Sequence, residues 1–258
     1  MDTGLCKFCG RNTELIEAHI VPKPFYTYFI SDGDKKPLII IDKSKPFESR
    51  CPKGFYDKSI LCGDCDKRFG VYDQEAIKLF LSDLSPYEKR AGDDSIYIIP
   101  PNAYNYKKLK LFFISMLWRA SVSSNSSFQH VKLGDKYEKL ALAVLKNPEL
   151  DNEKLFPVFI FKLKETPKYP IEGVFIDPTY YRLRNVRMYK FVFAGYSFNI
   201  KADKQELMPE FSKIALKSNS ELVIVGKSPQ EELSDMSVIF SMHNNLKITH
   251  MQQYGNKN

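Results

Sequence analysis

The sequence lacks the features of a membrane-spanning or secreted protein. No apolar run approaches the roughly 18 residues that a membrane-spanning helix needs. The first residues have neither the basic start nor the apolar stretch of a secretion signal. Only five cysteines occur in 258 residues, which suits a reducing compartment better than a disulfide framework. We therefore expect a cytoplasmic chain that makes no contact with a membrane.

The charge excess is small and lies outside the N-terminal part. The formal net charge is +7 at pH 7, of which residues 1–90 contribute +1 and the remainder +6. Such an excess attracts polyanions but does not identify a partner by itself. The 43% of hydrophobic residues is enough for a substantial core, and the sequence contains no internal repeat or low-complexity segment.

The cysteines form two C-x-x-C pairs that bracket the first 65 residues. Cys6 and Cys9 form one pair and Cys62 and Cys65 the other, while Cys51 is left without an assigned role. Four thiolates suit tetrahedral zinc, and two such pairs are the usual way to supply them. The spacing therefore predicts one structural zinc. The alternative is two unrelated pairs of buried or redox-active thiols.

The residues between and after these pairs carry a resemblance to a known family. His19-Ile-Val-Pro22 lies between the pairs, Leu61 precedes the second pair, and Lys67 and Phe69-Gly70 follow it. Together with the cysteines, this pattern resembles the HNH nucleases of the ββα-metal superfamily, in the subtype clamped by a four-cysteine zinc. The resemblance covers about the first 75 residues only.

The resemblance implies a hydrolytic site. By residue matching, His19 corresponds to the general base, and an imidazole with an ordinary pKa of about 6.5 can accept a proton near neutral pH. Asp57 and Asp66 match the positions that hold a catalytic cation, and carboxylates suit Mg²⁺ or Mn²⁺. Many family members have an acidic residue just before the histidine, where this sequence has Ala18. Glu17 is an uncertain substitute.

Three cations near the motif are candidates for holding substrate phosphates: Lys23, Lys67 and Arg68. Farther along, four cations alternate with aromatic residues in a pattern that could follow a nucleic-acid backbone. The alternative that we favour is a half-buried strand with one wet face. These residues are Tyr180, Tyr181, Arg182, Arg184, Arg187, Tyr189, Lys190 and Phe191. We expect structural roles for His130, His243 and His250, and a place in the core and its rim for Trp118-Arg119.

Hydrophobic periodicity predicts an α+β fold in three regions. The first, residues 1–75, is the zinc-clamped ββα module with strands at 15–21 and 58–61 and a helix from about residue 64. The second, 76–150, is mainly helical, with a strand at 95–100, an amphipathic helix around 109–120 and another around 137–145. The third, 151–258, is a mixed α/β region for a substrate or partner. It has strands at 156–163, 186–193, 196–200 and 222–225, and helices around 207–215 and after Ser228.

The leading hypothesis for function is a metal-dependent endonuclease that acts on DNA. The resemblance implies a role in restriction or in defence against phage, and a partner protein could supply specificity or activation. One alternative is a non-catalytic zinc module for nucleic-acid or protein interaction, which Ala18 favours. Another is a nuclease directed at RNA.

Overall fold

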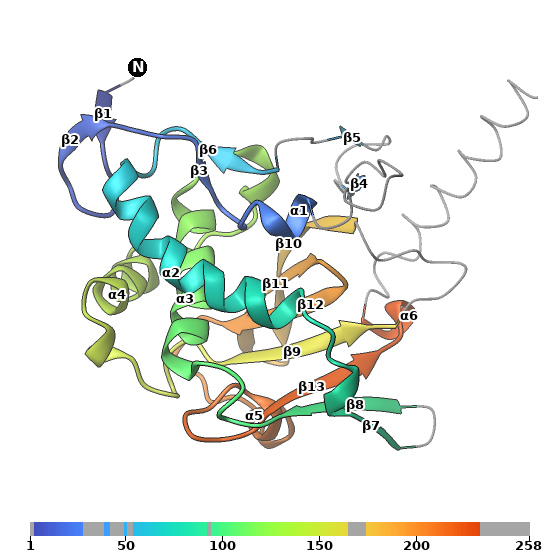
Figure 1. The fold of residues 1–258 in the computed structure, drawn as a ribbon. Coiled ribbons are helices and arrows are strands. Elements are labelled where there is room, and N and C mark those ends of the chain that lie inside the picture. The colour runs from blue at the N-terminus through green and yellow to red at the C-terminus, as the bar shows by residue number, and fades with distance from the viewer. Residues whose placement is uncertain are drawn as a thin grey trace, which may run out of the picture.

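The fold is built on one large mixed sheet. The computed structural model describes residues 3–27, 39–41, 49–50, 54–91, 94–164 and 174–232. Within these residues, nine strands lie in the order β5-β4-β10-β11-β12-β9-β13-β8-β7 (Figure 1). Their bounds are β4 Ile39–Ile41, β5 Ser49–Arg50, β7 Glu88–Ala91, β8 Asp94–Ile99, β9 Val158–Leu163, β10 Val174–Leu183, β11 Val186–Phe193, β12 Tyr196–Lys201 and β13 Leu222–Lys227. Cys51, His243 and His250 lie outside the described residues.

Most neighbouring strands run antiparallel. Only the β4–β10 and β9–β13 pairs are parallel. The strands predicted at 186–193 and 196–200 are confirmed as β11 and β12. They form a hairpin in which Ala194 and Gly195 both have positive φ angles, of 51° and 76°. A two-residue turn with two positive φ angles matches the twist of the strands that it joins. Strand β10 was not predicted.

Helices cover both faces of the sheet. On one face, α2 (Gly63–Phe80) and α3 (Tyr106–Val122) place Phe80 and Phe113 against Phe198 of β12, with ring centroids 4.9 and 5.5 Å apart. On the other face, α5 (Pro209–Ile214) places Phe211 on Phe159 of β9, at 4.8 Å. The core therefore consists largely of aromatic rings between the helices and the sheet.

The helix predicted around 109–120 is confirmed as α3, but the polar face that an amphipathic helix would have is missing from its middle, which is the most buried helical segment described. Every residue from Leu109 to Ser121 is buried. The sheet and α2 cover one side, and the amphipathic helix α4 (Gly134–Lys146) packs against another. Arg119 therefore lies in the core, with 1% of its surface exposed, and not at the rim.

Short elements build the N-terminal part (Figure 1). Strand β1 (Thr3–Leu5) pairs with β2 (Asn12–Glu14), and β3 (Ala18–His19) pairs with β6 (Tyr56–Asp57). The strand predicted at 15–21 is thus reduced to two residues, because the Ala18 N–H bonds back to the Ile16 carbonyl (2.9 Å) and turns the chain. The strand predicted at 58–61 is wrong: the pairing ends at Asp57, whose carboxylate accepts the Ser59 N–H in a turn.

The remaining elements are short. They are α1 Pro24–Thr27, α6 Pro229–Glu232 and the 3-10 turns Ser85–Tyr87, Ser126–Phe128 and Pro148–Leu150. A capping box begins α6, since Ser228 and Glu231 each accept the other's backbone N–H at 3.2 Å. The helix predicted beyond Glu232 lies outside the described part. The large sheet takes strands from all three predicted regions, and their division into domains stays a prediction. No described helix has the length and apolar character needed to cross a membrane.

Candidate metal centre and histidine site

The four predicted cysteines come together at the start of α2. The Sγ atoms of Cys6, Cys9, Cys62 and Cys65 all lie within 4.8 Å of one another, and those of Cys9 and Cys62 are 4.0 Å apart. Tetrahedral zinc with Zn–S bonds of about 2.3 Å requires sulfurs roughly 3.8 Å apart. The two pairs therefore form one cluster, and its donor set and spacing fit a zinc ion.

The chain around the cysteines folds to present their sulfurs. Gly10, with a φ of 76°, closes the first turn, and its N–H bonds to the Cys6 carbonyl at 2.8 Å. The Cys62 N–H donates to the Cys6 Sγ (3.4 Å), so one pair already contacts the other through the backbone. Leu15 and Cys62 form an isolated β-bridge that fixes the two turns side by side.

The electrostatic surroundings of the sulfurs are uneven. Arg11 donates to the Cys9 Sγ at 3.4 Å and to Asp64 at 3.0 Å. The hydrogen bond from Arg11 lowers the pKa of the Cys9 thiol to about 6. Burial, together with the other thiols, raises the pKa of Cys65. A divalent cation would hold both sulfurs as thiolates, and Arg11 adds a positive charge beside the cluster.

Strands β3 and β6 lead from this cluster to His19. Their register sets Ala18 opposite Asp57 and His19 opposite Tyr56, whose ring centroid is 6.3 Å from that of the imidazole. Helix α2 follows β6 after a short turn, which gives the chain a β–β–α order around the thiol cluster. His19 is partly exposed, whereas Ala18 is fully buried.

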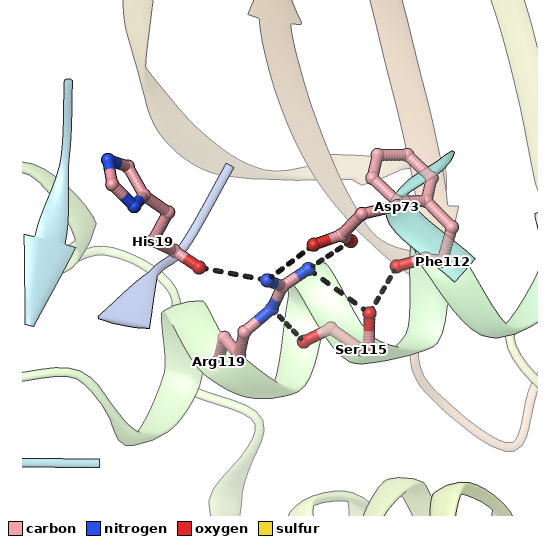
Figure 2. Close-up of polar contacts among 5 residues, drawn as sticks. All are labelled: His19, Asp73, Phe112, Ser115 and Arg119. Atoms are coloured by element: carbon pink, nitrogen blue, oxygen red, sulfur yellow. Dashed lines mark hydrogen bonds and ion pairs between the residues drawn. The ribbon is translucent and has the colours of Figure 1, made fainter. Parts of the chain in front are cut away.

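A buried arginine holds the backbone of His19. Arg119 of α3 donates from Nη1 to the His19 carbonyl at 2.8 Å and from Nη1 and Nη2 to the two oxygens of Asp73 on α2, at 3.1 and 2.7 Å. Ser115 contacts the same guanidinium through its carbonyl and hydroxyl. Figure 2 shows that the imidazole points away from Arg119 and Asp73, so Arg119 holds the backbone of His19 and the ring lies outside the ion pair.

Asp66 lies on the first turn of α2, close enough to the buried arginine for charges to act on it. Burial raises the pKa of Asp66. The charge of Arg119 lowers this pKa, Asp73 raises it, and His19 lowers it. The charge of His19 therefore acts on Asp66, and their joint role in a site stays a prediction. Asp73 and Arg119, which we did not predict, belong to the same surroundings.

The contacts of Asp57 differ from its predicted role as a cation ligand. Only 4% of its surface is exposed. Its two oxygens accept five hydrogen bonds from Ser59, Ser123 and Ser124, at 2.6 to 2.9 Å. Burial alone raises the pKa of Asp57, but these hydrogen bonds outweigh it and hold the pKa below the ordinary value. A carboxylate has about four acceptor positions, so none is left for a cation in this arrangement.

No protein-family model, curated protein or solved structure matches this chain. Any assignment of the candidate site therefore depends on the geometry of this chain alone. In the described part of the chain, the cysteines are the only group of three or more His, Cys, Asp or Glu residues gathered closely enough to hold an ion. His19, Asp57 and Asp66 do not surround one such point.

The other predicted site residues lie around the module. Lys23 and Lys67 are exposed. Arg68 donates to the carbonyls of Leu145 and Lys146 at the end of α4, both at 3.1 Å, which is a structural contact. Glu17 forms an exposed ion pair with Lys58 (3.1 Å). These placements leave Lys23 and Lys67 as cations that could approach a substrate phosphate.

Proposed function

We propose that the chain is a metal-dependent HNH-type endonuclease that hydrolyses phosphodiester bonds in DNA, with His19 as the general base. The observation that carries this proposal is the β3–β6–α2 unit, which begins at His19 and is clamped by the four-thiolate cluster. On this unit the imidazole is partly exposed, and the charge of His19 lowers the pKa of Asp66. The resemblance alone assigns the activity to restriction or antiphage defence.

The proposed roles follow from the contacts of each residue. Zinc bound by the four cysteines would be structural, because all four positions of a tetrahedral ion are filled by protein ligands. The His19 ring would accept the proton of the attacking water, with its position set by the bond from Arg119 to its carbonyl. Lys23 and Lys67 would contact substrate phosphates.

The proposal assigns Asp66 to the catalytic cation. Mg²⁺ and Mn²⁺ sites of this kind often use one or two carboxylates with substrate phosphate oxygens and water, so a closed protein cage is not required. When bound, the ion would neutralise charge on the phosphate. Asp57 has another part in this proposal: its five hydrogen bonds anchor the end of β6, opposite the strand of His19.

The test is cleavage of a supercoiled plasmid and of bis(p-nitrophenyl) phosphate by zinc-loaded protein, with Mg²⁺ or Mn²⁺ added. We expect activity from the natural chain and a loss of at least 100-fold in His19→Ala, the usual contribution of a general base. His130→Ala is the matched control, because His130 is the other histidine in the described part and is exposed. Activity that survives in His19→Ala would rule out this base.

A second candidate function is binding of nucleic acid without hydrolysis. It is favoured by the five hydrogen bonds of Asp57 and by Ala18, which leave Asp66 as the sole matched carboxylate near His19. This function predicts salt-dependent DNA retention with no cleavage in any metal. Competition between matched DNA and RNA distinguishes the RNA-directed alternative.

A further inference from the structure

Two arginines stand directly opposite each other on the β10–β11 hairpin. The register pairs Arg182 with Arg187 and, one pair farther along the same face, Tyr180 with Tyr189. Side chains of such pairs lie on the same face of the sheet, and like charges in this arrangement repel each other. An anion bound between them would offset the repulsion.

Tyr180 occupies the space beside the two guanidinium groups. The Nε of Arg182 donates to the Tyr180 hydroxyl at 2.9 Å, and the Arg187 guanidinium lies 5.7 Å from the centroid of its ring. The tyrosine itself is 42% exposed. We call Tyr180, Arg182 and Arg187 the arginine face. It presents an accessible aromatic ring between two cations.

Neither arginine is neutralised within the described part of the chain. No salt bridge there involves Arg182 or Arg187, in contrast to Lys190 of the same hairpin, which pairs with Glu232 at 2.8 Å. The acidic residue next to them, Asp203, accepts the backbone N–H of Arg187 and is paired with Lys201 at 3.0 Å. The positive charge of the arginine face is therefore available to a partner.

The opposite face of the hairpin has a structural role. The Tyr181 hydroxyl donates to Asn199 at 2.7 Å and Lys190 is held by Glu232, so both side chains are engaged within the protein. The cations and aromatic residues of this segment are thus divided between a packed face and a face that is wet only near the hairpin turn. On that second face Tyr180 and Arg182 are exposed, whereas Tyr189 and Phe191 are buried. Only the wet face can meet a ligand.

We propose that the arginine face binds the phosphate backbone of a nucleic acid, with Tyr180 stacking on an unpaired base. The guanidinium group of arginine can donate two parallel N–H bonds that match the geometry of phosphate oxygens. Aromatic rings next to such cations are typical of sites that bind single-stranded nucleic acid. An anionic membrane is the less suitable partner, because one tyrosine supplies little apolar area for insertion. This inference rests on the proposed nuclease function and supplies the substrate contact that this function needs.

The arginine face lies within reach of the histidine site. Ser124 bonds to Asp57 of β6, and the carbonyl of Lys132 accepts the hydroxyl of Tyr189, the strand partner of Tyr180. The nine residues from Ser124 to Lys132 span at most about 30 Å. One helical turn of duplex DNA measures about 34 Å, which exceeds this upper bound.

The test measures binding of a fluorescent 30-nucleotide single strand and its duplex by anisotropy, without divalent cations and from 50 to 200 mM salt. We expect Arg182→Ala/Arg187→Ala to weaken binding at least tenfold. The slope of log K against log salt concentration should become shallower by the amount that corresponds to about one to two phosphate contacts. Lys89→Ala/Arg90→Ala is the matched control, because it removes two exposed charges from β7 at the far edge of the sheet. Tyr180→Ala should weaken single-strand binding about tenfold and duplex binding less.

The outcomes separate this inference from the nuclease proposal. Equal binding by the arginine variant and its control would overturn the inference, as would a preference of the natural chain for phosphatidylserine vesicles over DNA. Bis(p-nitrophenyl) phosphate reports the chemistry without the extended surface. A variant that hydrolyses this small ester normally but no longer cuts plasmid supports both proposals. Arginine-dependent DNA binding without hydrolysis by the natural chain supports the inference and defeats the nuclease.

Discussion

Two anchors of different chemistry hold the β3–β6–α2 unit. At the start of α2, four thiols converge within 4.8 Å and suit a metal ion. Two turns farther along, Asp73 forms an ion pair with Arg119, whose guanidinium also holds the His19 carbonyl. The first anchor lies within the N-terminal module. The second comes from α3, outside the segment to which the family resemblance extends.

The difference teaches which part of the unit can act alone. All four thiols come from the N-terminal module, so α3 supplies no ligand to a metal ion bound there. The Arg119 guanidinium is buried among α2, α3 and β3, and removing α3 would take this donor away from both Asp73 and the His19 carbonyl. The backbone of the candidate base therefore depends on a helix that the motif does not include.

Disrupting the first anchor, the thiol cluster, should have the largest effect on the stability of the protein. We expect Cys65→Ser to lose the bound metal and about 5 kcal/mol or more of unfolding free energy, as is usual for a structural metal. Zinc content by mass spectrometry and denaturant unfolding measure the two losses. Cys65→Ser protein that keeps one zinc per chain and its full stability would refute the four-thiolate centre.

Breaking the second anchor should cost about 4 kcal/mol. Arg119→Met leaves the Asp73 side chain, which is 14% exposed, without its partner. Removal of one member of a buried ion pair typically costs 3–5 kcal/mol. The double variant Arg119→Met/Asp73→Leu should recover most of that stability, since neither charge remains. It should not recover plasmid cleavage if the bond to the His19 carbonyl positions the base. Full activity in the double variant would remove Arg119 from that role.

The two anchors also differ in how far the sequence predicts them. Cysteine spacing is a local pattern with one common physical meaning, and the cluster formed as expected. Arg119 follows Trp118 in an apolar helix, where a long cation usually reaches the rim, and nothing in the sequence pairs it with Asp73, 46 residues earlier. Burial of α3 on all sides depends on α4 and the sheet, which is tertiary information.

Asp57 shows that prediction from sequence has the same limit within the motif. Its position predicts a cation ligand by resemblance, yet Ser123 and Ser124 come from the distant end of α3 and fill its oxygens. Ser59, two residues away, is the one sign in the sequence of a turn that ends the strand. The ligand role of Asp57 stays a prediction, and its local conformation follows from serines that only the fold brings together.

Asp57→Asn should cost about 3 kcal/mol at pH 7, because an amide replaces a buried charged acceptor. The folded pKa of Asp57 lies below its ordinary value, so the carboxylate stabilises the fold fully above about pH 4 and less as the pH falls further. The stability gap between natural protein and variant should therefore shrink below that pH. A gap that is constant from pH 7 to pH 3 would contradict the assignment.

The smallest expected effect on stability concerns Lys110, a second buried cation on α3. Its partners are backbone carbonyls, whereas Arg119 is paired with a carboxylate. Its Nζ donates to the carbonyls of Leu155 and Phe156 at 2.6 and 2.9 Å. Burial lowers the pKa of Lys110 from 10.5 to about 8, against the opposing charges of Asp151 and Glu153. The unfolded chain therefore binds more protons between those values, so stability rises with pH.

We expect the unfolding free energy of the natural chain to gain about 1.5 kcal/mol between pH 8 and 9.5 relative to Lys110→Met. The range stops there because buried tyrosines with raised pKa values, such as Tyr181, destabilise the fold once the pH exceeds about 10. Denaturant melts of both proteins across the range isolate the lysine, since every other titrating group is shared. Parallel curves would mean that Lys110 keeps its ordinary pKa, and that two carbonyls stabilise its charge as well as a carboxylate would.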